Sequence, residues 1–216
     1  MLRAQEQTAF DELLLCDEVD RIIRQRLRIP TFATWKRRRL KLLAEYRRPE
    51  HWGWLADAPL VRAIQPTTDQ RVLVAGDRLE GPALYFAAHG CVVTALEPES
   101  EVVERVISAA ERVGLTTRLN GVSGALQGWL PDGPLTAVVC TPAAFAGLCP
   151  EERSRVIDLL QSATRDGGVH LVETIIAGQN VVTLDEITSR YQGWAISMER
   201  DDGSTRTFLA RKGAAA

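Results

Sequence analysis

The chain has 216 residues, 45% of them hydrophobic and 25% charged, which is the composition of a soluble globular protein of one or two domains. This composition excludes a disordered chain, a collagen-like fibre and a disulfide scaffold, and no uninterrupted run of about 18 apolar residues predicts a membrane-spanning helix. The N-terminus lacks the basic-then-apolar order of a secretory signal, and the four cysteines lack C-x-x-C spacing. We therefore expect a cytoplasmic protein whose cysteines are reduced core residues.

The net charge of −2 is unevenly distributed along the chain. Residues 1–19 carry a net charge of −4, residues 20–48 carry +9 and residues 49–216 carry −7. A basic block therefore lies between an acidic tip and a mildly acidic body. Such asymmetry is typical of proteins that bind an anionic partner, which is a nucleic acid, a membrane surface or an acidic protein face.

The N-terminal region is predicted to be helical. Apolar residues over 10–27 recur on one helical face, and a second helix is predicted to begin after a cap at Thr31 or Thr34 and to extend to Tyr46. A third, short helix is predicted over residues 54–64. These helices contain the basic block.

After Pro66 short apolar segments alternate with helical ones. The predicted strands cover residues 71–75, 91–96, 116–119, 135–140 and 169–174. The predicted helices cover residues 81–88, 99–113 and 150–163. Thr183 and Glu186 form a capping box that predicts the start of one more helix. Extended runs at 194–199 and 205–210, separated by Asp201-Asp202-Gly203, predict a terminal hairpin. The alternation predicts a parallel sheet covered on both faces, with its ligand at the carboxyl ends of the strands.

Several stretches of the sequence resemble the class I S-adenosylmethionine-dependent methyltransferases, in particular the small tellurite-resistance-type and other small-molecule members. These stretches are residues 71–99, 130–141, 148–160, 166–174 and 184–212. The resemblance implies a doubly wound, mostly parallel α/β sheet of seven strands, of the Rossmann-like methyltransferase type, with a C-terminal antiparallel hairpin. It also implies that this domain covers residues 55–216 and follows a helical, basic extension over residues 1–54.

The loop after the first strand departs from the family pattern. The family has an acidic residue and then G-x-G-x-G, whose glycines let the backbone approach the cofactor closely. Here Val74 stands at the acidic position, and the loop reads Gly76-Asp77-Arg78-Leu79-Glu80-Gly81. Gly76 matches the first glycine, whereas Arg78 and Glu80 replace the second and third. Glu97, which lies 21 residues after Gly76, matches the acid that pairs with the ribose hydroxyls.

The resemblance implies an S-adenosylmethionine site, although the altered loop leaves open whether the cofactor has been lost. The implied cofactor-binding residues are Gly76, Asp77, Gly81, Glu97, Pro98, Ser123 and Thr141. Ser123 stands near the position of the adenine in the family, and Thr141 ends the fourth strand. The tract Cys140-Thr141-Pro142 differs from the N/D-P-P-Y type that acts on amino groups of bases, so a small-molecule substrate is expected.

The sequence predicts neither catalytic residues nor a metal site, because its cysteines and histidines lack metal-ligand spacing. His89 is expected to be structural or solvated, and His170 is expected to lie in the core. The aromatic segment from His51 to Trp54 leaves two interpretations open, since it either lines the active site or packs as a linker. Methyl transfer depends mainly on proximity and orientation, so a missing general base does not exclude an enzyme.

The segment from Lys36 to Arg48 holds seven bases and one acid and is the candidate partner-binding surface. Its residues are Trp35, Lys36, Arg37, Arg38, Arg39, Lys41, Arg47 and Arg48. We expect it to bind an acidic protein or, as a peripheral contact, an anionic membrane surface, because the acidic body would repel a long nucleic acid.

Two functions stay open at this point. The chain is either a small-molecule methyltransferase or a catalytically inactive subunit of the same fold, docked through its basic N-terminal helices onto a larger, membrane-associated protein complex. An enzyme should have an open pocket between Gly76 and Glu97. In an inactive subunit that space should be filled, for example by Arg78 paired with Glu97 or Glu80, and a basic, Trp-rich face should be exposed.

Overall fold

The computed structural model describes residues 30–175, 183–200 and 205–213, together with six single residues, Leu15, Glu18, Val19, Arg21, Ile22 and Leu27. The chain divides into two compact units, residues 1–41 and residues 42–216, and the α/β fold belongs to the second. Most of the helix predicted over residues 10–27 and the turn over 201–203 lie outside the described residues. The domain boundary expected after residue 54 stays a prediction.

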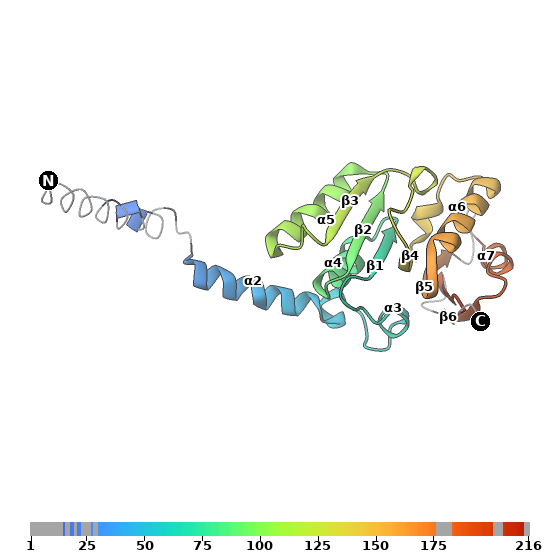
Figure 1. Ribbon diagram of the computed structural model, residues 1–216, viewed down its shortest axis with the longest axis horizontal. Coiled ribbons are helices and arrows are strands. Elements are labelled where there is room, and N and C mark those ends of the chain that lie inside the picture. The colour runs from blue at the N-terminus through green and yellow to red at the C-terminus, as the bar shows by residue number, and fades with distance from the viewer. Residues whose placement is uncertain are drawn as a thin grey trace, which may run out of the picture. The chain divides into compact units, whose positions relative to one another are not determined.

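Seven strands form one sheet in the part of the chain that the structure describes (Figure 1). They are β1 (Arg71–Ala75), β2 (Val92–Glu97), β3 (Leu119–Ser123), β4 (Leu135–Cys140), β5 (Thr164–Ile175), β6 (Ala195–Arg200) and β7 (Thr205–Arg211). Their order is β3-β2-β1-β4-β5-β7-β6. β7 is antiparallel to both of its neighbours, and the other neighbouring pairs are parallel. The predicted fold class, including the C-terminal hairpin, is confirmed.

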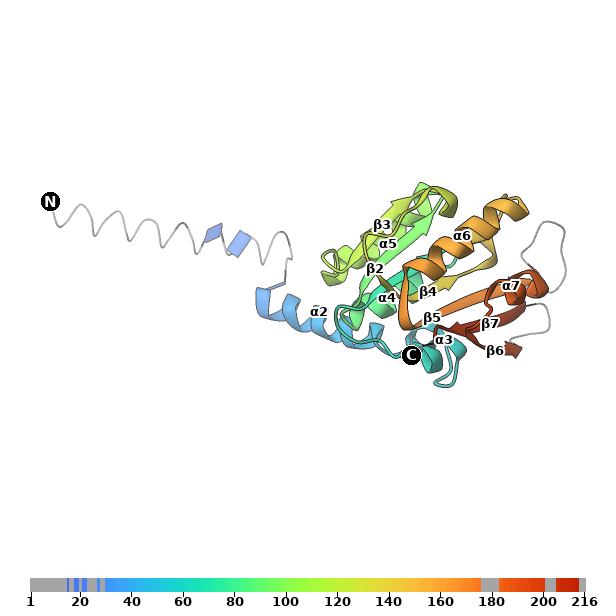
Figure 2. The same cartoon turned by 45° about the vertical axis from the view of Figure 1, so that its right-hand side comes forward.

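Helices cover both faces of this sheet (Figure 2). The α-helices are α2 (Phe32–Tyr46), α3 (Pro59–Ala63), α4 (Glu80–Ala88), α5 (Ser100–Val113), α6 (Pro150–Ala163) and α7 (Leu184–Arg190), with short 3-10 helices η1 (Pro49–Trp52), η2 (Leu126–Gly128) and η3 (Pro142–Phe145). α4 and α5 contribute to one buried cluster, and α6 and α7 contribute to the other. None of the described helices is both long and apolar enough to cross a membrane.

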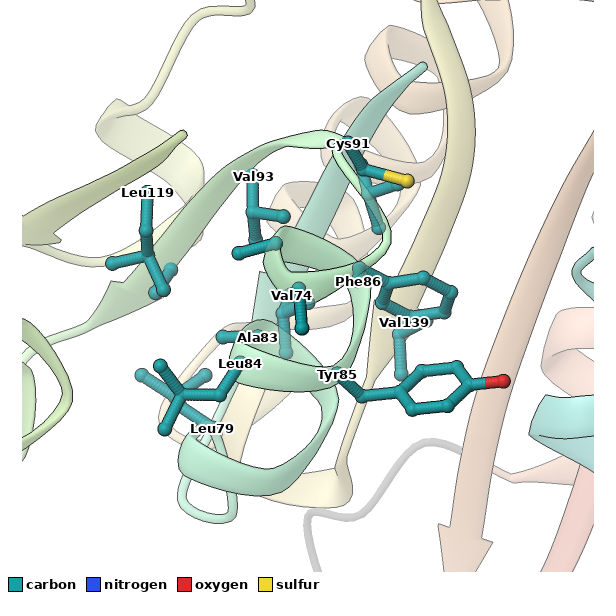
Figure 3. Close-up of a cluster of buried hydrophobic side chains, with 14 of the residues drawn as sticks. Val74, Leu79, Ala83, Leu84, Tyr85, Phe86, Cys91, Val93, Leu119 and Val139 are labelled. Carbon is teal, nitrogen blue, oxygen red and sulfur yellow. The ribbon is translucent and has the colours of Figure 1, made fainter. Parts of the chain in front are cut away.

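β1 is buried on both faces, which explains its continuous apolar sequence. Val72 and Val74 belong to the cluster with α4 and α5, whereas Leu73 and Ala75 belong to the cluster with α6 and α7. Side chains alternate between the faces of a strand, so a strand covered on both sides needs apolar residues throughout. Figure 3 shows Val74 in the first cluster, beside the residues of α4. β1 and β4 have the bounds that the sequence predicts.

β3 lies further along the chain than the residues 116–119 that the sequence predicts. The carbonyl of Leu115 accepts hydrogen bonds from the backbone N–H groups of Arg118 and Leu119, at 2.8 and 3.0 Å, so the chain turns after α5 before the strand begins. The strand then carries Gly121, where a Cβ would lie 2.6 Å from Val103 of α5. Close packing of α5 on the sheet explains a glycine at a position that strand propensity disfavours.

α3 is shorter than the helix predicted over residues 54–64, and it begins at Pro59. Proline has no backbone N–H and clashes with the carbonyl four residues earlier, so it is tolerated only in the first turn of a helix. A helix that began at Trp54 would place Pro59 in its interior. The prediction was wrong because it did not weigh this proline.

The cysteines differ in burial. Cys91 and Cys140 are buried as expected, and burial raises the pKa of the Cys91 thiol to about 11. Cys149 is exposed, which corrects the prediction of a core residue. It precedes α6 as the capping residue, where the carboxylate of Glu152 accepts a hydrogen bond from its backbone N–H at 2.9 Å. Cys16 lies outside the described residues.

His170 is a buried histidine with both ring nitrogens satisfied, as predicted. Nε2 lies 2.7 Å from Thr164 Oγ1, and Nδ1 lies 2.7 Å from the hydroxyl of Tyr191. The Thr164 hydroxyl donates to the carbonyl of Leu160 at 2.7 Å, so it accepts from Nε2–H, and Nδ1 accepts from Tyr191. Burial, with a smaller effect of the Lys212 charge, lowers the pKa of His170 to about 3. The ring is therefore neutral in the folded protein.

The neutral His170 predicts a loss of stability in mild acid. Below pH of about 6.5 the unfolded chain takes up a proton on this ring, whereas the folded protein does not until about pH 3. The free energy of unfolding therefore falls with falling pH, by about 1.4 kcal/mol per pH unit for this one proton. Urea unfolding between pH 7.5 and 4.5 should show a steeper fall for the wild type than for His170→Gln.

Parallel pH profiles for the two proteins would contradict this assignment. If the variant does not fold, the ring signals of His170 in NMR spectra of the wild type provide the same test. They should stay those of a neutral imidazole down to pH 4.5.

Candidate functional site

The carboxyl edge of the sheet brings together four of the predicted cofactor-binding residues. Glu97 is the last residue of β2, and Ser123, the last residue of β3, is its partner in the strand register. Gly76 follows β1, and Thr141 follows β4. Because β1 lies between β2 and β4, these residues line one continuous edge at the switch in strand order.

Glu97 is the most unusual side chain at this edge. It is only 8% exposed, and no donor among the described residues forms a hydrogen bond with its Oε2. Burial raises the pKa of this carboxyl group, the charges of Asp77 and Glu99 raise it further, and a hydrogen bond from the backbone N–H of Glu99 opposes the shift. A buried acceptor without a partner costs free energy, so this position favours a ligand that donates hydrogen bonds.

Gly76 allows another group to approach the backbone closely, and in this structure that group is the Thr141 side chain. Its φ is +110°, and a Cβ there would lie 1.9 Å from Thr141 Oγ1. The Thr141 hydroxyl donates to Asp77 Oδ1 at 2.7 Å and accepts from the Asp77 backbone N–H at 3.2 Å. The loop after β1 is thus fastened to the end of β4, and the space over the glycine is filled.

Arg78 stands at the second glycine position of the family and forms an ion pair with Glu173 of β5. Glu97 and Glu80, the two partners suggested as an example for an inactive subunit, are not the residues with which Arg78 pairs. The Arg78 side chain is 66% exposed, so it lies on the outer side of the loop. It extends past β4 to reach Glu173 on β5. Arg78 therefore does not fill the position beside Glu97.

A cavity of about 280 Å³ lies between this loop and α5. It is lined by Asp77, Arg78, Leu79, Glu80, Gly81, Val102, Arg105 and Val106. Its volume is at the lower limit of small-molecule sites. Glu97 is not among its lining residues, so this cavity is not the pocket between Gly76 and Glu97 that the enzyme hypothesis expects.

Gly81 and the aromatic segment before the domain are in contact. A Cβ on Gly81 would lie 3.2 Å from Trp54 and 3.5 Å from Trp52. Trp52 Nε1 donates to the carbonyl of Tyr46 at 2.9 Å, and the Tyr46 and Trp52 rings lie 5.0 Å apart. Trp52 and Trp54 also pack against the core cluster of α4 and α5. Of the two interpretations of this segment, the structure favours a packed linker.

The remaining predicted residues are exposed, with the exception of Arg39. Asp77 and Pro98 lie at the surface beside Gly76 and Glu97. The partner-binding residues Trp35, Lys36, Arg37, Arg38, Lys41, Arg47 and Arg48 are exposed, and Arg39 is half-buried. Arg39 places its guanidinium 5.3 Å from the centre of the Trp35 ring. Arg47 Nε donates to the carbonyl of Ala88 at 2.7 Å, so this residue also anchors the chain to α4.

The comparisons with known proteins give structures but no family. No family model matches the sequence. TehB from Haemophilus influenzae is 19% identical and superimposes with a TM-score of 0.59 over 76% of this chain, which spans 65% of TehB. The N-methyltransferase NodS from Bradyrhizobium japonicum WM9 is 12% identical, with a TM-score of 0.57 over 74% of this chain and 99% of NodS. The glycopeptide N-methyltransferase MtfA, in complex with S-adenosylmethionine, is 13% identical, with a TM-score of 0.55 over 68% and 83%.

The chain has the class I methyltransferase fold. The sheet order and the antiparallel β7 agree with this assignment, which confirms the resemblance drawn from the sequence. At identities of 12–19% the likeness assigns the fold and not an activity, because unrelated functions share folds.

Two contacts of this methyltransferase-fold domain were not predictable from the sequence. Asp77 and Thr141 are 64 residues apart, and Arg78 and Glu173 are 95 residues apart. No motif links either pair, since the contacts depend on which strands lie side by side. The strand order of the family places Glu173 two strands away from β1, but it does not indicate that a loop arginine reaches it.

Because Thr141 packs against Gly76, adding one methyl group at Gly76 should lower the stability of the folded protein strongly. Gly76→Ala places a Cβ against Thr141 Oγ1 at a positive φ, so we expect a loss of unfolding free energy of about 2 kcal/mol or more in urea titrations. Gly124→Ala is the matched control, because Gly124 has no atom within 4 Å of its Cβ position. Adding Thr141→Ala to Gly76→Ala should restore part of the loss. Equal stability of Gly76→Ala and Gly124→Ala would contradict the contact.

Proposed function

We propose that the α/β domain binds S-adenosylmethionine, or its product S-adenosylhomocysteine, with the ribose hydroxyls at Glu97, and that it methylates a small molecule. The observation that carries this proposal is the buried Oε2 of Glu97, which has no donor among the described residues. A ribose diol offers two hydroxyl donors, which is what a carboxylate with free acceptor positions requires.

The residues at this edge fit the nucleoside half of the cofactor. Ser123 lies in register with Glu97 and is exposed beside it, and its hydroxyl is the group we propose for the base. The neighbour MtfA was solved with S-adenosylmethionine, which supports this cofactor for the fold. The approach over Gly76 is different, because Thr141 fills it. The amino-acid half of the cofactor must therefore pass outside the contact of Asp77 with Thr141.

The cofactor, when bound, supplies an electrophilic methyl group, and the protein has to supply orientation. Glu97 would fix the ribose, and the fastened loop would hold the edge of β1 rigid against β4 through Asp77 and Thr141. Orientation alone accounts for much of the rate of such a transfer, so the site needs no general base. The end of β4, Cys140-Thr141-Pro142, is unlike the tract that acts on base amines, which supports a small-molecule acceptor.

The proposal predicts opposite effects of one substitution on stability and on binding. The pKa of the Glu97 carboxyl group is raised because its ionised form is destabilised by burial. Glu97→Gln removes this charge, so the melting temperature of the ligand-free protein should rise at pH 7–8. The same change should weaken the binding of S-adenosylhomocysteine about tenfold or more in calorimetric titrations, because two charge-assisted hydrogen bonds are weakened. Glu104→Gln, an exposed change on α5 that does not act on the pKa of Glu97, should alter neither property. An absence of binding at millimolar ligand would contradict the proposal.

A second function is favoured by a different observation, the exposed surface of α2. Phe32, Trp35 and Leu40 are 73%, 43% and 56% exposed, and the rings of Phe32 and Trp35 stack at 5.7 Å. Exposed aromatic residues beside lysines and arginines are typical of helices that dock on anionic surfaces. We propose this helix as the docking element of an inactive subunit, a function that the filled space over Gly76 also supports.

Docking of α2 on an anionic membrane surface predicts co-sedimentation of the chain with phosphatidylglycerol vesicles, but not with phosphatidylcholine vesicles. A triple variant should weaken this binding about tenfold or more; its changes are Arg37→Gln, Arg38→Gln and Lys41→Gln. A salt concentration of about 0.5 M should abolish the binding of the wild type. Arg155→Gln, an exposed change on α6, is the control. Equal binding of the triple variant and the wild type would contradict docking through α2.

A further inference from the structure

The ion pair of Arg78 with Glu173 crosses the carboxyl edge of the sheet. Arg78 belongs to the loop between β1 and α4, and Glu173 lies near the end of β5. β4 separates β1 from β5 in the sheet, so the pair spans β4 at the end that carries Thr141. A ligand held at Glu97 that extended past β1 would reach this side of the edge.

A ligand carboxylate can take the place of Glu173 in this ion pair. The Arg78 and Glu173 side chains are 66% and 28% exposed, and exposed ion pairs contribute little to folding, about 1 kcal/mol or less. An arginine keeps its charge at any physiological pH and binds carboxylates through a planar pair of N–H donors. A carboxylate on a ligand can therefore replace that of Glu173 at small cost.

When Arg78 leaves Glu173 on β5, its guanidinium can move over β4, which is two strands from β2 and Glu97. Neighbouring strands lie about 4.8 Å apart, so a group above β4 is about 10 Å from the strand that ends in Glu97. The amino-acid half of S-adenosylmethionine ends in an α-carboxylate at a comparable distance from the ribose hydroxyls. The path over Gly76 is filled by Thr141, which leaves the outer side of the loop, where Arg78 lies.

We propose that Arg78 binds the α-carboxylate of the cofactor's amino-acid half and that Glu173 occupies Arg78 until this carboxylate replaces it. The inference rests on the proposed cofactor site at Glu97 and deepens it. It gives a role to an arginine at a position where the family has glycine. Nucleosides that carry the amino-acid carboxylate are then selected over those that lack it, and Glu173 acts as an internal competitor.

Calorimetric titration of the full chain with two nucleosides tests this proposal. S-adenosylhomocysteine carries the carboxylate, whereas 5′-methylthioadenosine has the same adenosine and sulfur without it. Arg78→Gln should weaken binding of the first about tenfold and leave the second within twofold. Glu173→Gln should strengthen binding of the first about two- to fivefold and leave the second unchanged. Arg105→Gln, an exposed arginine on α5 that lines the same cavity as Arg78, is the matched control.

Opposite effects of Arg78→Gln and Glu173→Gln on S-adenosylhomocysteine are the decisive result, because loss of a purely structural ion pair would change affinity in the same direction in both. Changes in the same direction, or equal changes for both nucleosides, overturn the proposal. One outcome overturns this inference and leaves the proposed function standing. In that outcome Glu97→Gln abolishes methylthioadenosine binding, whereas Arg78→Gln changes the binding of neither ligand. An absence of binding by either nucleoside to any variant overturns the proposed function together with it.

Discussion

Burial of the Glu97 carboxyl group is the constraint on which the rest of the carboxyl edge depends. The group ends β2 at the switch in strand order, and one of its oxygens has no donor among the described residues. A buried carboxylate in this state costs free energy, and the nearby charge of Asp77 increases that cost. A ligand that donates hydrogen bonds to this group would therefore stabilise the folded domain.

The loop after β1 forms contacts that close part of the carboxyl edge. Thr141 fills the space over Gly76, so the glycine serves the fastening of the loop to β4. Arg78 pairs with Glu173 and not with Glu97, whose carboxyl group stays buried at the end of β2. The loop therefore lacks the open space over Gly76 that a glycine-rich loop provides, and its arginine does not pair with Glu97. That combination explains why the sequence supported an enzyme and an inactive subunit almost equally.

The sequence predicted the sheet well where burial on both faces demands apolar runs, as in β1 and β4. It misplaced β3, because the requirement for Gly121 comes from the packing of α5 and not from strand propensity. At the site, the register of Glu97 was predictable from its spacing to the first glycine. The partners of Arg78 and Thr141 were not, because they depend on loop paths between residues distant in sequence.

The most direct test of this account is a crystal structure of the chain with S-adenosylhomocysteine. Both ribose hydroxyls are expected within hydrogen-bond distance of the Glu97 carboxylate, about 2.5–3.0 Å, with the contact of Asp77 and Thr141 intact. A nucleoside bound elsewhere would contradict it. A Glu97 carboxylate hydrogen-bonded only to groups of this chain, in crystals soaked at millimolar ligand, would contradict it equally.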